Sequence, residues 1–126
     1  MKKLVSLTSA AGLALLVALT ATASTVNRNF QVTNAANAVV GSGSYSYNDA
    51  AGAANVFGET EFQLTAFSFT FDGNNFSLLD LDGGKGLVLL GAGNQLLGLE
   101  AYRSAGTPFS FLPGAAGSED FFVYGT

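Results

Sequence analysis

The sequence predicts an all-β fold, and three observations support that prediction. From Ser24 onward, β-favouring residues recur in short runs, clusters of Gly, Asn and Asp separate these runs, and no apolar run keeps a helical spacing through several turns. About eight short strands at such intervals, with no segment suited to a parallel crossover, are typical of a single antiparallel β-sandwich. A small barrel is the alternative.

The N-terminal segment has the order of a secretory signal peptide. Lys2 and Lys3 give it a positive start, residues 10–19 form an apolar run, and residues 21–23 are small. This pattern predicts cleavage after Ala23, so that residues 1–23 are a signal peptide and residues 24–126 the mature domain. The apolar run is too short to cross a bilayer comfortably, so we expect no membrane span after processing.

The mature chain is acidic and poor in reactive side chains. It has three cations (Arg28, Lys85 and Arg103) against nine carboxylates, a net charge of −6. Three scattered cations cannot neutralise a phosphate backbone, so we expect neither nucleic acid nor an anionic membrane as a partner. The absence of His and Cys excludes Ser/His/Asp and Cys/His catalysis, thiolate metal sites and disulfides.

The clearest strand is residues 62–71, where large apolar and small polar side chains alternate. In a regular strand, Phe62 and Leu64 would point to the side opposite the phenylalanines that follow them. A bulge near Thr65 and Ala66 is therefore needed to bury these five side chains together. Three phenylalanines then share one side of the strand: Phe67, Phe69 and Phe71.

The turn cluster at residues 72–75 predicts a hairpin between this strand and the next. The Ala content of residues 49–58 could support a helical turn, but their Gly content favours a loop. Seven further strands are expected, each bounded by turn residues: 29–33, 38–47, 76–81, 87–90, 95–102, 108–112 and 121–124.

Two of these patterns carry a family resemblance. The run GSGSYSYND at residues 41–49 and the run LTAFSFTFDGNNFSLLD at residues 64–80, with a closing strand after residues 117–120, are similar to an exported domain of the exosortase-sorted (PEP-CTERM) class of cyanobacterial and proteobacterial proteins. The resemblance implies a β-sandwich outside the cytoplasm that is linked to surface polysaccharide. Members of that class end in a Pro-Glu-Pro box, an apolar helix and a basic tail, whereas this chain ends in Tyr-Gly-Thr, so we do not expect exosortase sorting.

Two pairs of side chains are candidate ligand sites. Tyr45 and Tyr47 share one side of a strand, and if that side faces solvent they form a platform on which sugar rings could stack. Burial of both would exclude such a platform. Asp80 and Asp82 stand beside a Gly-rich turn and offer the hard oxygen ligands that Ca²⁺ prefers, although a solubilising role at a turn is the simpler interpretation.

One pair of carboxylates has the residue types that a glycosidase uses. Glu59 and Glu61 share a face of an extended segment, but residues two apart lie side by side and cannot flank a scissile bond by themselves. Glu100 or Asp120 could complete such a pair, yet nothing in the sequence selects either. We therefore expect no enzymatic activity and no cofactor, with Ca²⁺ at Asp80 and Asp82 as the alternative.

We expect a non-enzymatic structural protein of the cell surface or matrix. Its expected location is secreted, periplasmic or at the cell surface. Its low charged fraction of 11%, its many Gly, Ser and Thr residues and the edge-prone strand at residues 121–124 suit self-association by strand addition. The alternative is a polysaccharide-binding module, assisted by calcium. The expected partners are therefore extracellular polysaccharide or a second copy of the chain.

Overall fold

The computed structural model describes residues 7–8, 14–15, 23–114 and 120–125. The predicted signal peptide, residues 1–23, lies largely outside these residues. Apart from residue 23, only β1 (Leu7–Thr8) and β2 (Ala14–Leu15) are described within it, and they pair with each other. The main sheet contains nine strands: β3 (Thr25–Thr33), β4 (Val39–Asn48), β5 (Ala53–Ala54), β6 (Thr60–Phe71), β7 (Asn74–Ser77), β8 (Leu87–Leu90), β9 (Leu96–Arg103), β10 (Phe109–Leu112) and β11 (Phe121–Tyr124).

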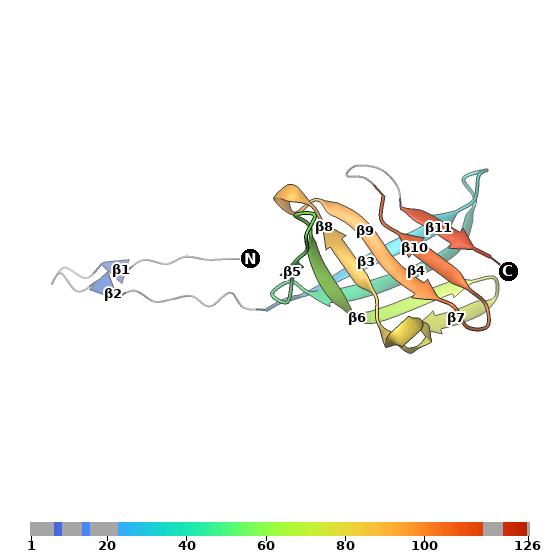
Figure 1. The fold of residues 1–126 in the computed structure, drawn as a ribbon, viewed down its shortest axis with the longest axis horizontal. Coiled ribbons are helices and arrows are strands. Elements are labelled where there is room, and N and C mark those ends of the chain that lie inside the picture. The colour runs from blue at the N-terminus through green and yellow to red at the C-terminus, as the bar shows by residue number, and fades with distance from the viewer. Residues whose placement is uncertain (1–6, 9–13, 16–22, 115–119, 126) are drawn as a thin grey trace.

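The prediction of an antiparallel all-β fold is confirmed, and the strands form one continuous curled sheet. The hydrogen-bonded order is β11-β10-β9-β8-β6-β4-β3, with β5 and β7 also pairing with β6, and every pair is antiparallel. The sheet curls into a half-barrel (Figure 1), so that β3, β4 and β6 face β9, β10 and β11 across the core. The two faces of the expected sandwich are thus two halves of the same sheet.

Strand β6 is the joint between these halves. Its first residues, Thr60 to Gln63, pair with β8, and its later residues pair with β4 and β7. Ser46 of β4 pairs with Ala66 while the next residue, Tyr47, pairs with Leu64, so Thr65 is the extra residue of a bulge. The bulge predicted from side-chain parity is confirmed at this position.

The core is dominated by aromatic rings on the concave side of the sheet. Phe69 is fully buried, and its ring centroid lies 5.1 Å from that of Phe111 and 5.6 Å from that of Phe30. These three rings come from β6, β10 and β3, so they connect strands that are far apart in the sheet order. The phenylalanine content of the chain therefore serves mainly to fill the half-barrel.

The expected strand at residues 76–81 is shorter than predicted. β7 ends at Ser77, and a 3₁₀ turn, η1 (Leu78–Asp80), follows it. The Asp80 carboxylate accepts hydrogen bonds from the backbone N–H and the hydroxyl of Ser77, which caps the turn. Two further 3₁₀ turns, η2 (Asp82–Gly84) and η3 (Ala92–Asn94), precede β8 and β9.

Candidate functional site

A groove of about 730 Å³ lies where the curled sheet stays open. One wall is β3 and the other consists of residues of β9, β10 and β11. Arg28 and Asp120 line the groove together with Tyr45, whose pKa is raised to about 12 chiefly by burial, with nearby Arg28 acting in the opposite direction. The groove combines aromatic walls with one cation and one carboxylate.

The carboxylate of Asp120, which lines the groove, binds backbone N–H groups of its own chain. One oxygen of Asp120 accepts a hydrogen bond from the Leu99 N–H at 3.1 Å, and the other accepts one from the Gly114 N–H at 3.4 Å. Gly98 has a φ of +142°, and a Cβ at this position would lie 2.1 Å from an Asp120 oxygen. Asp120 therefore ties the start of β11 to β9, and only glycine at position 98 allows this close approach.

The predicted tyrosine platform is wrong. Tyr45 and Tyr47 are only 5% and 3% exposed, and they point into the core, where the Tyr47 ring centroid lies 5.0 Å from that of Phe62. The alternation along β4 is as expected, but the outer side of the strand carries Ser44 and Ser46. An exposed aromatic surface for sugar stacking is therefore absent from this part of the chain.

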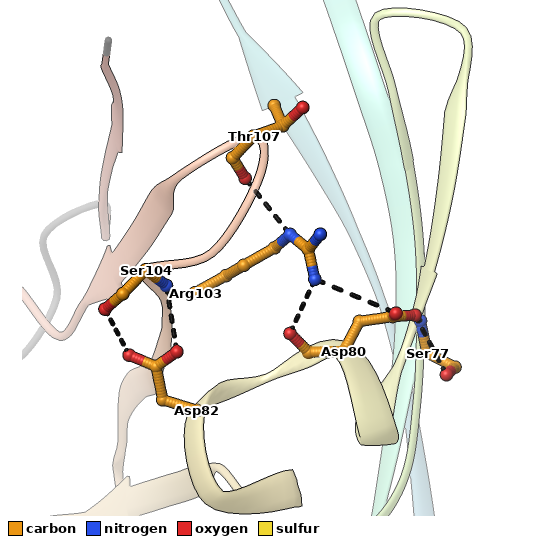
Figure 2. A network of polar contacts seen from close by, with 6 residues as sticks. All are labelled: Ser77, Asp80, Asp82, Arg103, Ser104 and Thr107. Carbon is orange, nitrogen blue, oxygen red and sulfur yellow. Dashed lines mark hydrogen bonds and ion pairs between the residues drawn. The ribbon is translucent and has the colours of Figure 1, made fainter.

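Asp80 and Asp82 lie in a polar network that fastens the η1–η2 segment to the end of β9 (Figure 2). The Asp82 carboxylate accepts two hydrogen bonds from Ser104, one from the hydroxyl at 2.5 Å and one from the backbone N–H at 2.8 Å. These bonds lower the pKa of Asp82, and the bonds from the Ser77 backbone and hydroxyl lower the pKa of Asp80.

Arg103 completes this network from β9. Its Nη1 donates to the Asp80 backbone carbonyl at 2.8 Å and lies 3.7 Å from an Asp80 carboxylate oxygen, while its Nε donates to the Thr107 carbonyl at 3.1 Å (Figure 2). The guanidinium also lies 5.1 Å from the ring centroid of Phe76. One arginine thus joins the η1 turn, the loop before β10 and the rim of the core.

This network gives both aspartates a role other than calcium binding. Each carboxylate is directed at donors of its own chain, and within the described residues no group of three or more His, Cys, Asp or Glu side chains is placed to hold a metal. Calcium binding by Asp80 and Asp82 stays a prediction. Sequence reasoning missed the network because Asp82 and Ser104 are 22 residues apart.

The carboxylate pair of Glu59 and Glu61 is likewise engaged. The side-chain amide of Asn55 donates to an oxygen of Glu59 at 2.9 Å and to one of Glu61 at 3.2 Å. The side-chain oxygen of Asn55 accepts hydrogen bonds from the backbone N–H groups of Phe57 and Glu59. These four hydrogen bonds close the loop between β5 and β6. This arrangement orders a turn.

The outer side of β3, β4, β6 and β7 carries a regular set of uncharged polar side chains, which we call the hydroxyl–amide face. It forms because small polar residues alternate with the buried aromatic residues on these strands. Its members are Asn27, Asn29 and Gln31 on β3, Ser42, Ser44 and Ser46 on β4, Ser68 and Thr70 on β6, and Asn75 on β7.

The two ends of the sheet order are the other notable feature. Of the residues that the structure describes, none pairs with the outer edge of β3 or of β11. β3 contributes nine residues to its edge, and β11 contributes four. Phe121 and Val123 of β11 are 64% and 52% exposed.

The chain matches no protein-family model, no curated protein and no solved structure. In the described part of the chain, no helix has the length and apolar character needed to span a membrane. Function must therefore be inferred from the geometry of the chain itself.

Proposed function

We propose that this chain is a secreted, non-enzymatic structural protein of a bacterial cell surface or extracellular matrix, and that its copies associate through the free edges of the half-barrel. The observation that carries the proposal is the open sheet, whose outer strands β3 and β11 have no strand partner on their outer sides among the described residues. Unpaired strand edges present rows of N–H and C=O groups that can pair with another chain.

The β11 edge has the composition of an association surface. Phe121 and Val123 expose apolar side chains on the outer side of this strand. Natural monomers usually protect such edges with charges or proline, and β11 contains neither.

Pairing β11 of one copy with β3 of the next would use both edges of each inner copy. One terminal copy of the assembly would keep a free β3 edge and the other a free β11 edge. Such a head-to-tail contact repeats unless its rotation closes a ring, so it produces a filament or an open array. A junction of about four residues is small, which suits an assembly that relies on many weak contacts.

The carboxylates support the non-enzymatic part of the proposal. Asp49 accepts two hydrogen bonds from Ser24, Asp82 accepts two from Ser104, and Asp120 accepts from two backbone N–H groups. These groups fasten strands and turns to each other. The signal-peptide pattern of residues 1–23 and the resemblance to exported proteins support a location outside the cytoplasm.

The experiment is sedimentation velocity of the purified chain over a concentration series. The test variant is Phe121→Lys/Val123→Lys, which puts two charges on the β11 edge without disturbing the core. The matched control is Val56→Lys/Phe57→Lys, which changes the same two residue types in the loop before β6, where they are 92% and 82% exposed.

We expect the parent and the control to form larger species as concentration rises, while the β11 variant remains monomeric. A monomeric parent at every concentration would overturn the proposal. Equal association by the β11 variant and the parent would also overturn it, because the β11 edge would then not be used.

A further inference from the structure

The hydroxyl–amide face is a grid rather than a scatter of polar side chains. Across the strands, Asn29 pairs with Ser44, and Ser44 pairs with Ser68. The next row contains Gln31, Ser42, Thr70 and Asn75, and the preceding row contains Asn27, Ser46 and Ala66. In a sheet, such rows repeat about every 7 Å along a strand, and neighbours within a row are about 4.8 Å apart.

No member of the face is charged, although the chain as a whole is strongly acidic. Arg28 also belongs to β3, but it pairs with the buried Tyr45, so its side chain lies on the concave side of the sheet. The outer side of the other half of the sheet is different, because it carries Glu100, the half-exposed Tyr102 and the apolar Phe121 and Val123. The uncharged polar surface is therefore confined to the outer side of β3, β4, β6 and β7.

Hydrogen bonds within the face hold some of its side chains in place. The Ser46 hydroxyl donates to the Asn27 side-chain carbonyl, and the Thr70 hydroxyl donates to that of Asn75 at 2.7 Å. Each bond uses the carbonyl end of an amide and leaves its NH₂ group as a donor for something outside the chain. Side chains that are already ordered lose less conformational entropy when they bind a ligand.

We propose that the hydroxyl–amide face binds the surface of an insoluble, neutral polysaccharide. Hydroxyl and amide groups donate and accept hydrogen bonds, as sugar hydroxyls do, and binding between them desolvates no charge. A charged polymer would find no opposite charge on this face. No member of the face is aromatic, so a single short oligosaccharide makes too few contacts with it, whereas an extended surface engages many rows at once.

β3 contributes outer side chains to this face and its backbone edge to the proposed self-association, whereas β11 belongs only to the latter. An assembly joined through β3 and β11 would present one copy of the face per subunit, so the two properties would reinforce each other. The inference does not depend on that assembly, because a single copy carries the whole grid.

The test is depletion of the purified chain from solution by three insoluble neutral polysaccharides: cellulose, chitin and a β-1,3-glucan. Calcium alginate beads serve as the charged comparison. The variant Ser44→Arg places a long cation at the centre of the grid. The matched control Ser110→Arg makes the same change on the outer side of β10, in the other half of the sheet.

We expect at least one neutral polysaccharide to bind the parent and Ser110→Arg equally, and Ser44→Arg to bind at least about tenfold more weakly, because several hydrogen bonds are lost together. Short soluble oligosaccharides of the same sugar should not compete. Failure to bind any of the three neutral polymers would overturn the proposal. Binding to alginate alone, or equal binding by the two arginine variants, would overturn it as well.

Discussion

The ring of Phe69 on β6 meets the ring of Phe111 on β10 edge to face, with centroids 5.1 Å apart and planes at 74°. Edge-to-face contacts of this kind are favourable beyond the area that they bury. Because β6 and β10 lie in opposite halves of the half-barrel, this contact holds the curl closed on its aromatic side.

Truncating Phe69 should therefore weaken the whole domain. Phe69 is 0% exposed and lies among six other phenylalanine rings besides that of Phe111, so Phe69→Ala should lower the free energy of unfolding by about 3–5 kcal/mol. Phe57→Ala, at an exposed loop position, should change it by less than about 0.5 kcal/mol. Urea unfolding followed by circular dichroism measures both, and similar losses in the two variants would contradict this core assignment.

Gly43 of β4 is a position where even a methyl group is excluded. A Cβ there would lie 2.2 Å from the Ser68 backbone carbonyl and 2.5 Å from the Phe30 ring. Backbone of β6 cannot move aside cheaply, so Gly43→Ala should cost at least about 1–3 kcal/mol. Gly125→Ala, where no atom lies within 4 Å, is the control. Thermal unfolding of the two variants gives the comparison, and an unchanged midpoint for Gly43→Ala would show that β4 and β6 are not this close.

Acid should destabilise the chain through Asp49, Asp80 and Asp82. Hydrogen bonds from Ser24, Ser77 and Ser104 lower the pKa of these three groups from their ordinary value of 3.8. A group with a lowered folded-state pKa contributes stability above its unfolded pKa and loses that stability as the pH falls through the folded pKa.

The variant Ser104→Ala tests this pH dependence. It removes the hydroxyl that donates to Asp82, so stability should decline less steeply below the ordinary aspartate pKa than in the parent. Ser110→Ala changes a serine on the outer side of β10 and should keep the steepness of the parent. Unfolding midpoints measured between neutral pH and about pH 2 give the slopes, and identical slopes for all three proteins would refute the role of Ser104.

Arg103 should not be replaceable by lysine. Its Nη1 and Nε donate to two carbonyls, those of Asp80 and Thr107, and one ammonium group cannot reach both in the same geometry. Arg103→Lys should therefore lower the free energy of unfolding by about 1–3 kcal/mol. Arg28→Lys, at an exposed side chain of β3, is the matched control. If the two lysine variants are equally stable, the network of Figure 2 does not contribute as described.

Local patterns predicted the strands well because alternation and turn residues act over short distances. The change of side between Leu64 and Phe67 predicted a bulge near Thr65 and Ala66, and the structure has it at Thr65. The strands at Leu87–Leu90 and Phe121–Tyr124 have the expected bounds. The alternation of Tyr and Ser along β4 was also clear. Alternation assigns side chains to two sides of a strand, but it does not say which side faces the core. One side of β4 carries tyrosines, which are amphipathic, and the other carries serines, which are polar. Because neither set is purely apolar, the strand alone did not show which side is buried.

Long-range features were beyond local patterns. The division of β6 between β8 and β4 decides that the sheet is continuous, and nothing within residues 60–71 specifies those partners. The bonds from Ser104 to Asp82 and from Leu99 to Asp120 join residues more than 20 positions apart. Sequence reasoning identified the carboxylates as notable but could not see their donors. Gly98 inside a strand was the local sign that Asp120 approaches β9 closely.

Association through the sheet edges can be measured by hydrogen–deuterium exchange of the purified chain at low and high concentration. We expect peptides covering β3 and β11 to become more protected as concentration rises, because only edge amides gain partners between copies, while peptides covering β8 and the loop at residues 55–58 do not change. If protection of β3 and β11 does not depend on concentration, or rises elsewhere instead, the copies do not associate through these edges.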